Sequence, residues 1–96
     1  MMILITYDVD TTTREGARRL RQVAKVCESC GVRVQNSTFE LLADPARYVQ
    51  IRQKIDAIID KERDSVRFYQ LGNNWNRRIE TLGRSIGIQQ GETLIL

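Results

Sequence analysis

Two carboxylates near the start of the chain, Asp8 and Asp10, are the residues best placed to do chemistry. They belong to the run 3–10, which is apolar until these acids appear and predicts a strand. Alternation along a strand puts both acids on one face. Thr12 followed by Glu15 gives the T-x-x-E pattern of a capping box, which marks a helix start. We therefore expect both carboxylates at a strand-to-helix junction.

A magnesium ion suits such carboxylates. Mg²⁺ prefers oxygen ligands, keeps several waters, and needs one or two protein carboxylates when phosphates supply the rest. Asp8 is the better candidate, because Asp10 lies closer to the helix start and can favour the positive end of the helix dipole or solvate a loop. A two-fold axis near the end of the first strand would bring two copies of Asp8 together. The alternative, Asp8 as a turn or cap residue, stays open.

Composition excludes several kinds of catalysis. The chain has 96 residues, 42% of them hydrophobic, and no histidine, which removes Ser-His-Asp and Cys-His mechanisms and the usual mixed Cys/His zinc sites. A chain this short has a marginal core alone, which favours a partner subunit. The 15 Lys and Arg against 12 Asp and Glu give a mild excess of +3, which hints at a polyanionic partner.

The two cysteines, Cys27 and Cys30, form a C-x-x-C motif that would suit a redox pair or half of a zinc site. They fall near the end of a predicted helix, whereas the activated thiol of a redox motif gains from a helix N-terminus, and no second C-x-x-C completes a metal site. We interpret them as core residues. Two free thiols, without a signal peptide or membrane-spanning run, favour a reducing cytoplasm and no membrane contact.

Periodicity predicts the remaining elements. Apolar residues recur at helical spacing over 13–30, and residues 32–42 are predicted to form two strands or one long bent strand. A second helix is expected to start at Pro45 with Asp44 as its cap, and 65–71 is a further predicted strand. The order βαββαβ predicts an α+β, ferredoxin-like domain: an antiparallel four-stranded sheet with two helices on one face.

We place the ferredoxin-like domain at residues 1–72 and a C-terminal extension at 73–96. The extension ends in the apolar stretch 93–96, which predicts a strand. A terminal strand so far from its domain needs an edge to pair with, and that edge can belong to a second copy of the chain. A frayed tail is the alternative.

Cations line one side of the first predicted helix. Arg14, Arg18, Arg21 and Lys25 are spaced by four, three and four residues, which puts them on a single stripe with no acid at those positions. Such a row is often only a solvated face, and Arg19 adds to the same sign. The cations that we predict to bind nucleic acid are Arg14, Arg18, Arg21, Lys25, Arg33, Arg77 and Arg78.

Three segments carry a resemblance to a known family. They are Tyr7-Asp8-Val9, the segment 33–40 (RVQNSTFE) and the segment 64–72 (DSVRFYQLG), which together cover nearly the whole predicted core in order. The chain resembles the small CRISPR-associated proteins that form the second, nuclease-like component of spacer acquisition. The family usually has an apolar residue where this chain has Thr38, which leaves the site untouched.

The resemblance implies a ferredoxin-like homodimer in which each C-terminal strand joins the partner's sheet. It also implies that Asp8 of each chain meets its copy near the two-fold axis, binds Mg²⁺ and is catalytic. The implied activity is metal-dependent endonuclease cleavage of RNA or double-stranded DNA, and the implied partner is the CRISPR integrase subunit. A water activated by the metal would attack the phosphodiester while arginines place the backbone. No general base is evident.

Other functions fit the same topology. One alternative is a non-catalytic, double-stranded DNA-binding scaffold of the spacer-integration complex, which needs the basic residues but no metal. An RNA-recognition module would require stacking aromatics on two central strands, and Tyr7 with Phe39 do not supply that pattern. A small-molecule regulatory domain is also compatible, since fold does not fix function, but a glycine-rich or apolar pocket signature is lacking.

Overall fold

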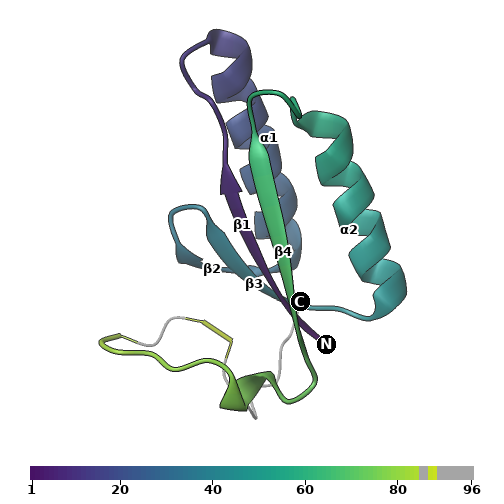
Figure 1. Ribbon diagram of the computed structural model, residues 1–96, viewed down its shortest axis with the longest axis vertical. Coiled ribbons are helices and arrows are strands. Elements are labelled where there is room, and N and C mark those ends of the chain that lie inside the picture. Colours follow the sequence, from purple (N-terminus) through teal and green to yellow (C-terminus); the bar gives the residue numbers. More distant parts are fainter. Residues whose placement is uncertain (85–86, 89–96) are drawn as a thin grey trace.

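A computed structural model of the protein describes residues 1–84 and 87–88. Four strands and two helices follow one another in the order βαββαβ, and a short 3₁₀ turn comes after them (Figure 1). The elements are β1 (Met2–Asp8), α1 (Arg14–Cys30), β2 (Val32–Gln35), β3 (Thr38–Leu42), α2 (Pro45–Ile58), β4 (Ser65–Gly72) and η1 (Trp75–Arg77). The order predicted from the sequence is confirmed.

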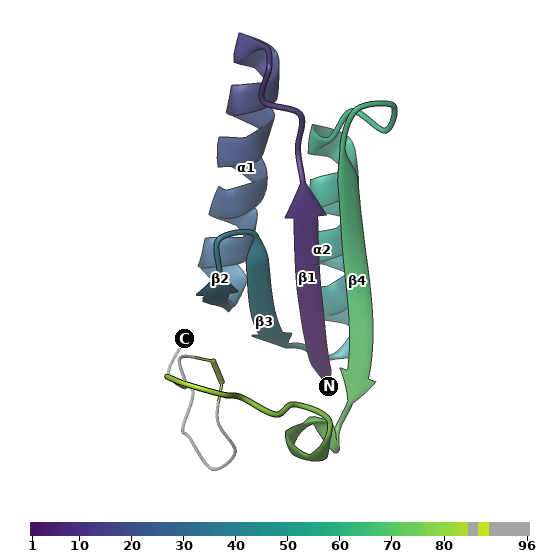
Figure 2. The same ribbon diagram turned by 60° about the vertical axis from the view of Figure 1, so that its left-hand side comes forward.

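The four strands form one antiparallel sheet in the order β2-β3-β1-β4. Helices α1 and α2 lie side by side on one face, as the turned view makes clear (Figure 2). This is the ferredoxin-like α+β arrangement that the sequence predicts. Strand β1 lies between β3 and β4, so its residues are flanked on both sides by paired backbone.

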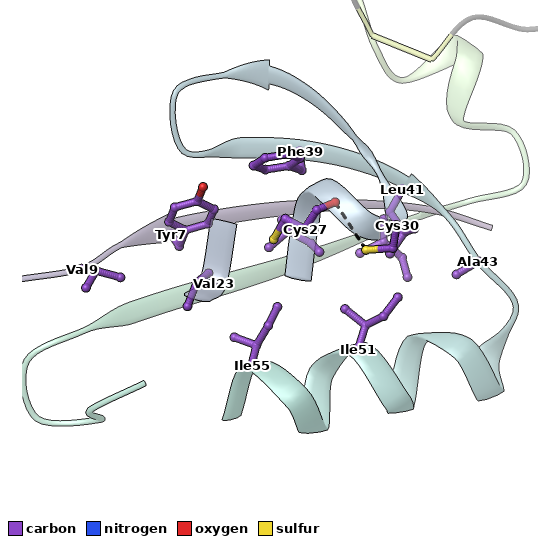
Figure 3. Close-up of a cluster of buried hydrophobic side chains, with 12 residues drawn as sticks. Tyr7, Val9, Val23, Cys27, Cys30, Phe39, Leu41, Ala43, Ile51 and Ile55 are labelled. Atoms are coloured by element: carbon purple, nitrogen blue, oxygen red, sulfur yellow. Dashed lines mark hydrogen bonds between the residues drawn. The ribbon is translucent and has the colours of Figure 1, made fainter. Parts of the chain in front are cut away.

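The alternation along β1 separates a core face from an open face. Ile3, Ile5 and Tyr7 are buried against the helices, whereas Thr6 is partly exposed and Asp8 is exposed. The core that they join is filled from both helices and from β3 (Figure 3). Its members include Val23, Cys27, Phe39, Leu41, Ile51 and Ile55, each at most 3% exposed. The core face of β1 therefore positions the open face that carries Asp8.

Both cysteines are buried and free, which confirms their assignment to the core. Burial raises the pKa of the Cys27 thiol to about 12, with a further contribution from nearby Cys30. Cys30 donates from Sγ to the carbonyl of Val26 at 3.2 Å. A thiol with so high a pKa stays protonated at neutral pH, so it is a poor nucleophile or metal ligand.

The start of α1 differs from the prediction by one residue. Thr13, not Thr12, is the N-cap, and its Oγ1 accepts from the backbone N–H of Gly16 at 3.0 Å. Thr12 is occupied elsewhere: its N–H and hydroxyl both donate to Asp10 Oδ1, at 2.9 and 2.7 Å. This turn also ends β1 at Asp8 rather than at Asp10 as predicted.

The start of α2 agrees with the prediction. Asp44 is the N-cap, its Oδ1 accepts from the N–H of Arg47 at 2.8 Å, and Pro45 opens the helix. Within α2, Ile51 and Ile55 are buried, while the outer face is charged and exposed.

The described part of the C-terminal extension lies against the open face of the sheet at the end away from Asp8 (Figure 1). Glu40 of β3 is buried there, and its Oε1 accepts from the N–H of Ile88 at 2.8 Å. The predicted strand 93–96 lies outside the described residues, and so does its pairing with a partner. Within the described residues, no helix has the length and apolar character needed to cross a membrane.

Gly16 offers a test of the β1–α1 junction. A Cβ at position 16 would overlap the carbonyl oxygen of Asp10. Gly→Ala in an exposed helix usually stabilises by about 1 kcal/mol, but overpacking of this kind costs roughly 1–3 kcal/mol. We therefore expect Gly16→Ala to lower the free energy of unfolding, measured by urea denaturation.

Gln22→Ala, at an exposed position of the same helix, is the matched control and should change stability by less than about 0.5 kcal/mol. A Gly16→Ala variant as stable as the wild type would show that the junction relaxes freely.

Candidate metal and nucleic-acid site

Asp8 is the last residue of β1 and lies on the open face of the sheet. It pairs across the ladder with Ser65, the first residue of β4. A shallow depression of about 380 Å³ surrounds it, lined by Thr6, Tyr7, Asp8, Ser65 and Arg67. Among residues 1–84 and 87–88, no hydrogen bond or ion pair engages the Asp8 carboxylate. Its oxygens are therefore free to bind a cation.

A single chain supplies few metal ligands at this position. The described residues contain no group of three His, Cys, Asp or Glu side chains that would hold a metal. Mg²⁺ tolerates such a site, since water and phosphate oxygens complete its octahedral shell. The Asp8 carboxylate fits Mg²⁺ in donor type and exposure, but the remaining ligands must come from outside residues 1–84 and 87–88.

Asp10 has a structural role in the turn. Its carboxylate accepts the two hydrogen bonds from Thr12 described above, and these lower the pKa of Asp10 below its ordinary value. Its own backbone N–H donates to Asp64 Oδ1 at 3.1 Å. This agrees with the reading of Asp10 as a loop residue rather than a metal ligand.

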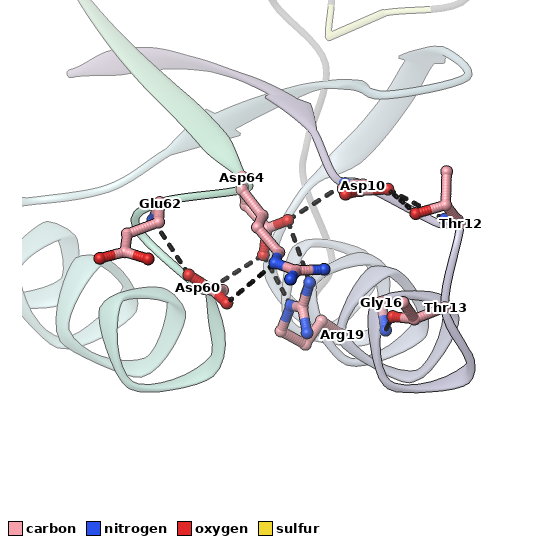
Figure 4. Close-up of polar contacts among 9 residues, drawn as sticks. Asp10, Thr12, Thr13, Gly16, Arg19, Asp60, Glu62 and Asp64 are labelled. Carbon is pink, nitrogen blue, oxygen red and sulfur yellow. Dashed lines mark hydrogen bonds and ion pairs between the residues drawn. The ribbon is translucent and has the colours of Figure 1, made fainter.

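Asp64 is the centre of the polar network beneath the junction (Figure 4). Its side chain is fully buried and accepts from the N–H groups of Asp10 and Asp60, at 3.1 and 2.9 Å. Arg19 Nε completes the set at 2.7 Å, with Nη2 at 3.4 Å. The hydrogen bond from Arg19 is the main reason that the pKa of Asp64 is lowered. In the sequence, Asp64 was noted only as the first residue of the segment 64–72, and no role was predicted for it.

The structure places the charge of Arg19 differently from what the sequence predicts. The sequence suggested that it adds to the basic surface, but its guanidinium turns inward to Asp64 and is only 16% exposed. A buried carboxylate needs a cation and several donors, and Arg19 is the helix residue that reaches it. Its charge is neutralised inside the protein.

The predicted stripe on α1 is exposed. Arg14, Arg18, Arg21 and Lys25 all face solvent, and none forms an ion pair within the part of the chain that the structure describes. None of them lines the depression around Asp8. The structure therefore gives the chain two separate features, a carboxylate on the sheet and a cationic helix surface.

None of the other three predicted cations lines the Asp8 depression, and Arg33 contacts α1 through Glu28. Arg33 donates to Glu28 Oε1 and to the carbonyl of Asn36, each at 2.6 Å, and its guanidinium lies 4.8 Å from the ring centre of Phe39. Arg77 and Arg78 are exposed in and just after η1, at the end of the sheet opposite Asp8 (Figure 2). Their binding to nucleic acid stays a prediction.

Sequence reasoning missed Ser65 and Arg67 as neighbours of Asp8. Alternation within β4 sets Ser65, Arg67 and Tyr69 on the face opposite Val66 and Phe68, so the face itself was readable. The nearness of these residues to Asp8 could not be predicted, because it depends on the register between β1 and β4.

The fold and site together define a small α+β protein whose described residues include one free acid on the sheet and several cations without an ion pair on the surface. A family model described as "CRISPR associated protein Cas2" matches residues 1–79. The chain belongs to this Cas2 family, which confirms the resemblance drawn from the three sequence segments.

Relatives match along nearly the whole chain. A Rhodospirillum rubrum protein named "CRISPR-associated endoribonuclease Cas2 3" is 52% identical over 95 residues, covering 99% of this chain and 100% of that one. The crystal structure of Streptococcus pyogenes Cas2 at pH 6.5 is 57% identical with a TM-score of 0.75, covering 86% of this chain and all of that one. A chain of a partial Cas6-RT-Cas1–Cas2 complex is 25% identical with a TM-score of 0.71, covering 99% and 98%.

The hydrogen bonds around Asp64 predict that Asp64→Asn lowers the stability of the protein. The amide would place a donor against Arg19 or a backbone N–H, so we expect a loss of about 3 kcal/mol in the free energy of unfolding at pH 7. Asp56→Asn removes an exposed ion pair with Lys61 and should cost less than about 1 kcal/mol.

The effect of Asp64→Asn on the free energy of unfolding should also depend on pH. Because folding lowers the pKa of Asp64, its contribution is complete above the unfolded value near 3.8 and is lost as the pH falls through the lower folded value. The stability difference between wild type and Asp64→Asn should therefore shrink when urea unfolding is repeated below pH 4. A difference that stays constant down to pH 2 would contradict the ionised role of Asp64.

Proposed function

We propose that this Cas2-family protein is a Mg²⁺-dependent endonuclease of CRISPR spacer acquisition, which cleaves phosphodiester bonds of RNA or double-stranded DNA in the cytoplasm. The observation that carries the proposal is the exposed carboxylate of Asp8, which has no partner among the described residues. The Rhodospirillum rubrum relative is named an endoribonuclease. Carboxylate chemistry remains available to a chain without histidine.

Asp8 would hold the metal and, with it, the reacting phosphate. When bound, Mg²⁺ supplies Lewis-acid activation of water and neutralises charge on phosphate oxygens. Asp8 would hold that ion from the end of β1, a central strand of the sheet. Cations of the chain place the nucleic-acid backbone, which gives position rather than sequence preference.

The active form would be a homodimer that assembles with the integrase subunit. One Asp8 per chain is a sparse metal site, and a second copy supplies the second carboxylate through a two-fold axis. The extension 73–96, with its predicted strand, would join the partner's sheet. The matched chain from a Cas1–Cas2 complex supports assembly with Cas1.

A scaffold without cleavage is the second candidate. It is favoured by the four exposed cations of α1, which lie outside the Asp8 depression and carry no ion pair among the described residues. In that function the cationic helix grips duplex DNA and Asp8 is dispensable. The two candidates differ in their need for metal.

The variant Asp8→Asn distinguishes the nuclease from the scaffold. For the nuclease, we expect the variant to lose at least 100-fold of the cleavage rate on labelled RNA or duplex DNA in Mg²⁺, because a neutral amide is a far weaker ligand for Mg²⁺. Its binding to the same substrates in chelator should match the wild type.

Asp56→Asn, an exposed acid on α2, is the matched control and should cleave normally. Equal activity in Asp8→Asn and wild type, or no metal-dependent activity in either, would favour the scaffold.

The α1 stripe predicts how strongly nucleic-acid binding depends on salt concentration. Each phosphate contact contributes about 0.9 to the slope of log K against log salt. We expect the double variant Arg18→Gln/Arg21→Gln to reduce the magnitude of this slope by roughly 2 per bound chain, measured by fluorescence anisotropy on a labelled duplex. Arg47→Gln/Arg52→Gln on α2 is the matched control. An equal change of the salt slope in both double variants would show that the α1 stripe is not a specific nucleic-acid-binding surface.

A further inference from the structure

The open face of the sheet holds one cation within the Asp8 depression, Arg67. In the antiparallel pairing of β1 with β4, Thr6 lies opposite Arg67 and Asp8 opposite Ser65. Arg67 is thus the diagonal neighbour of Asp8, and diagonal residues on one face are roughly 7–8 Å apart. That spacing is too wide for a direct contact between short side chains but leaves room for a bridging ion and phosphate.

The guanidinium of Arg67 is hydrogen-bonded to a residue of its own strand. Its Nη1 donates to Tyr69 Oη at 3.0 Å, two residues further along β4. No ion pair joins it to any acid in residues 1–84 and 87–88. Arg67 therefore keeps both its charge and most of its donors. A guanidinium with free donors binds phosphate oxygens in a bidentate manner.

The surroundings of Arg67 suit a phosphate. Among the described residues, Asp8 is the one acid that lines the depression, and Thr6 and Ser65 add hydroxyl groups on the same face. A phosphate without a metal is still attracted by the guanidinium of Arg67, which is the closer group to it when no cation lies at Asp8. A phosphate carrying a divalent cation satisfies both side chains, because the cation lies toward Asp8 and free phosphate oxygens lie toward the guanidinium.

We propose that Arg67 binds the phosphodiester that lies against Asp8, and that Tyr69 is a positioning residue which holds the guanidinium in place. This inference rests on the proposed nuclease site and adds its phosphate-binding residue. The contact is to the nucleic-acid backbone and carries no base preference. Of the exposed arginines with no ion pair in the described structure, Arg67 is the one that lines the Asp8 depression.

The binding arm of the test needs no metal. We expect Arg67→Gln to weaken binding of a labelled RNA or duplex in chelator several-fold and to reduce the magnitude of the salt slope by about 1 per bound chain. Arg52→Gln, an exposed arginine on α2, should leave both unchanged. Arg67→Lys should keep the slope, since it keeps the charge. A wild-type slope and affinity in Arg67→Gln would overturn the proposal.

The cleavage arm tests Tyr69. Tyr69→Phe keeps the ring and removes the hydroxyl that accepts from Arg67. We expect the cleavage rate at saturating substrate to fall several-fold with little change in KM or melting temperature. Tyr48→Phe is the matched control, since Tyr48 packs edge-on against Phe68 on the helix side of the sheet. An unchanged rate in Tyr69→Phe would overturn the positioning role.

The two arms separate this inference from the proposed function. If the wild type fails to cleave in Mg²⁺, the nuclease function fails, while the salt slope still decides whether Arg67 binds phosphate. If Asp8→Asn abolishes cleavage and Arg67→Gln changes neither binding nor cleavage, the nuclease function stands and the Arg67 site is wrong.

Discussion

The buried carboxylate of Asp64 is the contact on which the geometry of the site depends. It joins three segments far apart in the sequence: the exit of β1 through Asp10, helix α1 through Arg19, and the α2–β4 turn through Asp60. A charge buried this deeply is tolerated because its oxygens meet several donors and a cation. The same contacts hold the end of β1 beside the start of β4. Asp8 and Ser65 face each other at that point.

Local patterns predicted the elements because each element is stabilised by its own periodicity and caps. The helix start at Asp44-Pro45 is an example, since both signals act within one turn. The start of α1 was misplaced by one residue because Asp10 competes for Thr12, and Asp10 is itself held by Asp64, 54 residues away. No local pattern contains that contact. The inward direction of the Arg19 side chain could not be predicted for the same reason, because it depends on the buried carboxylate of Asp64.

The candidate site was predicted in part for similar reasons. Strand alternation and the position of the acids were enough to single out Asp8, and helical spacing was enough to find the exposed stripe on α1. The relation between the two was beyond the sequence, because it depends on which face of the sheet the helices cover. Arg67 was missed since its nearness to Asp8 is a property of the register between the first and last strands of the domain.

Three aspartates at one junction differ in what surrounds them, and this difference assigns their roles. Both oxygens of Asp64 and Oδ1 of Asp10 accept hydrogen bonds, which lowers the pKa of each residue and holds each side chain in a structural contact. Asp8 accepts no hydrogen bond from the described residues and lies exposed. One free carboxylate binds Mg²⁺ weakly, so the remaining ligands must arrive with a phosphate or with a second chain. Under the proposed function, metal binding at Asp8 would therefore be coupled to nucleic-acid binding or assembly, and cleavage would be restricted to the assembled complex.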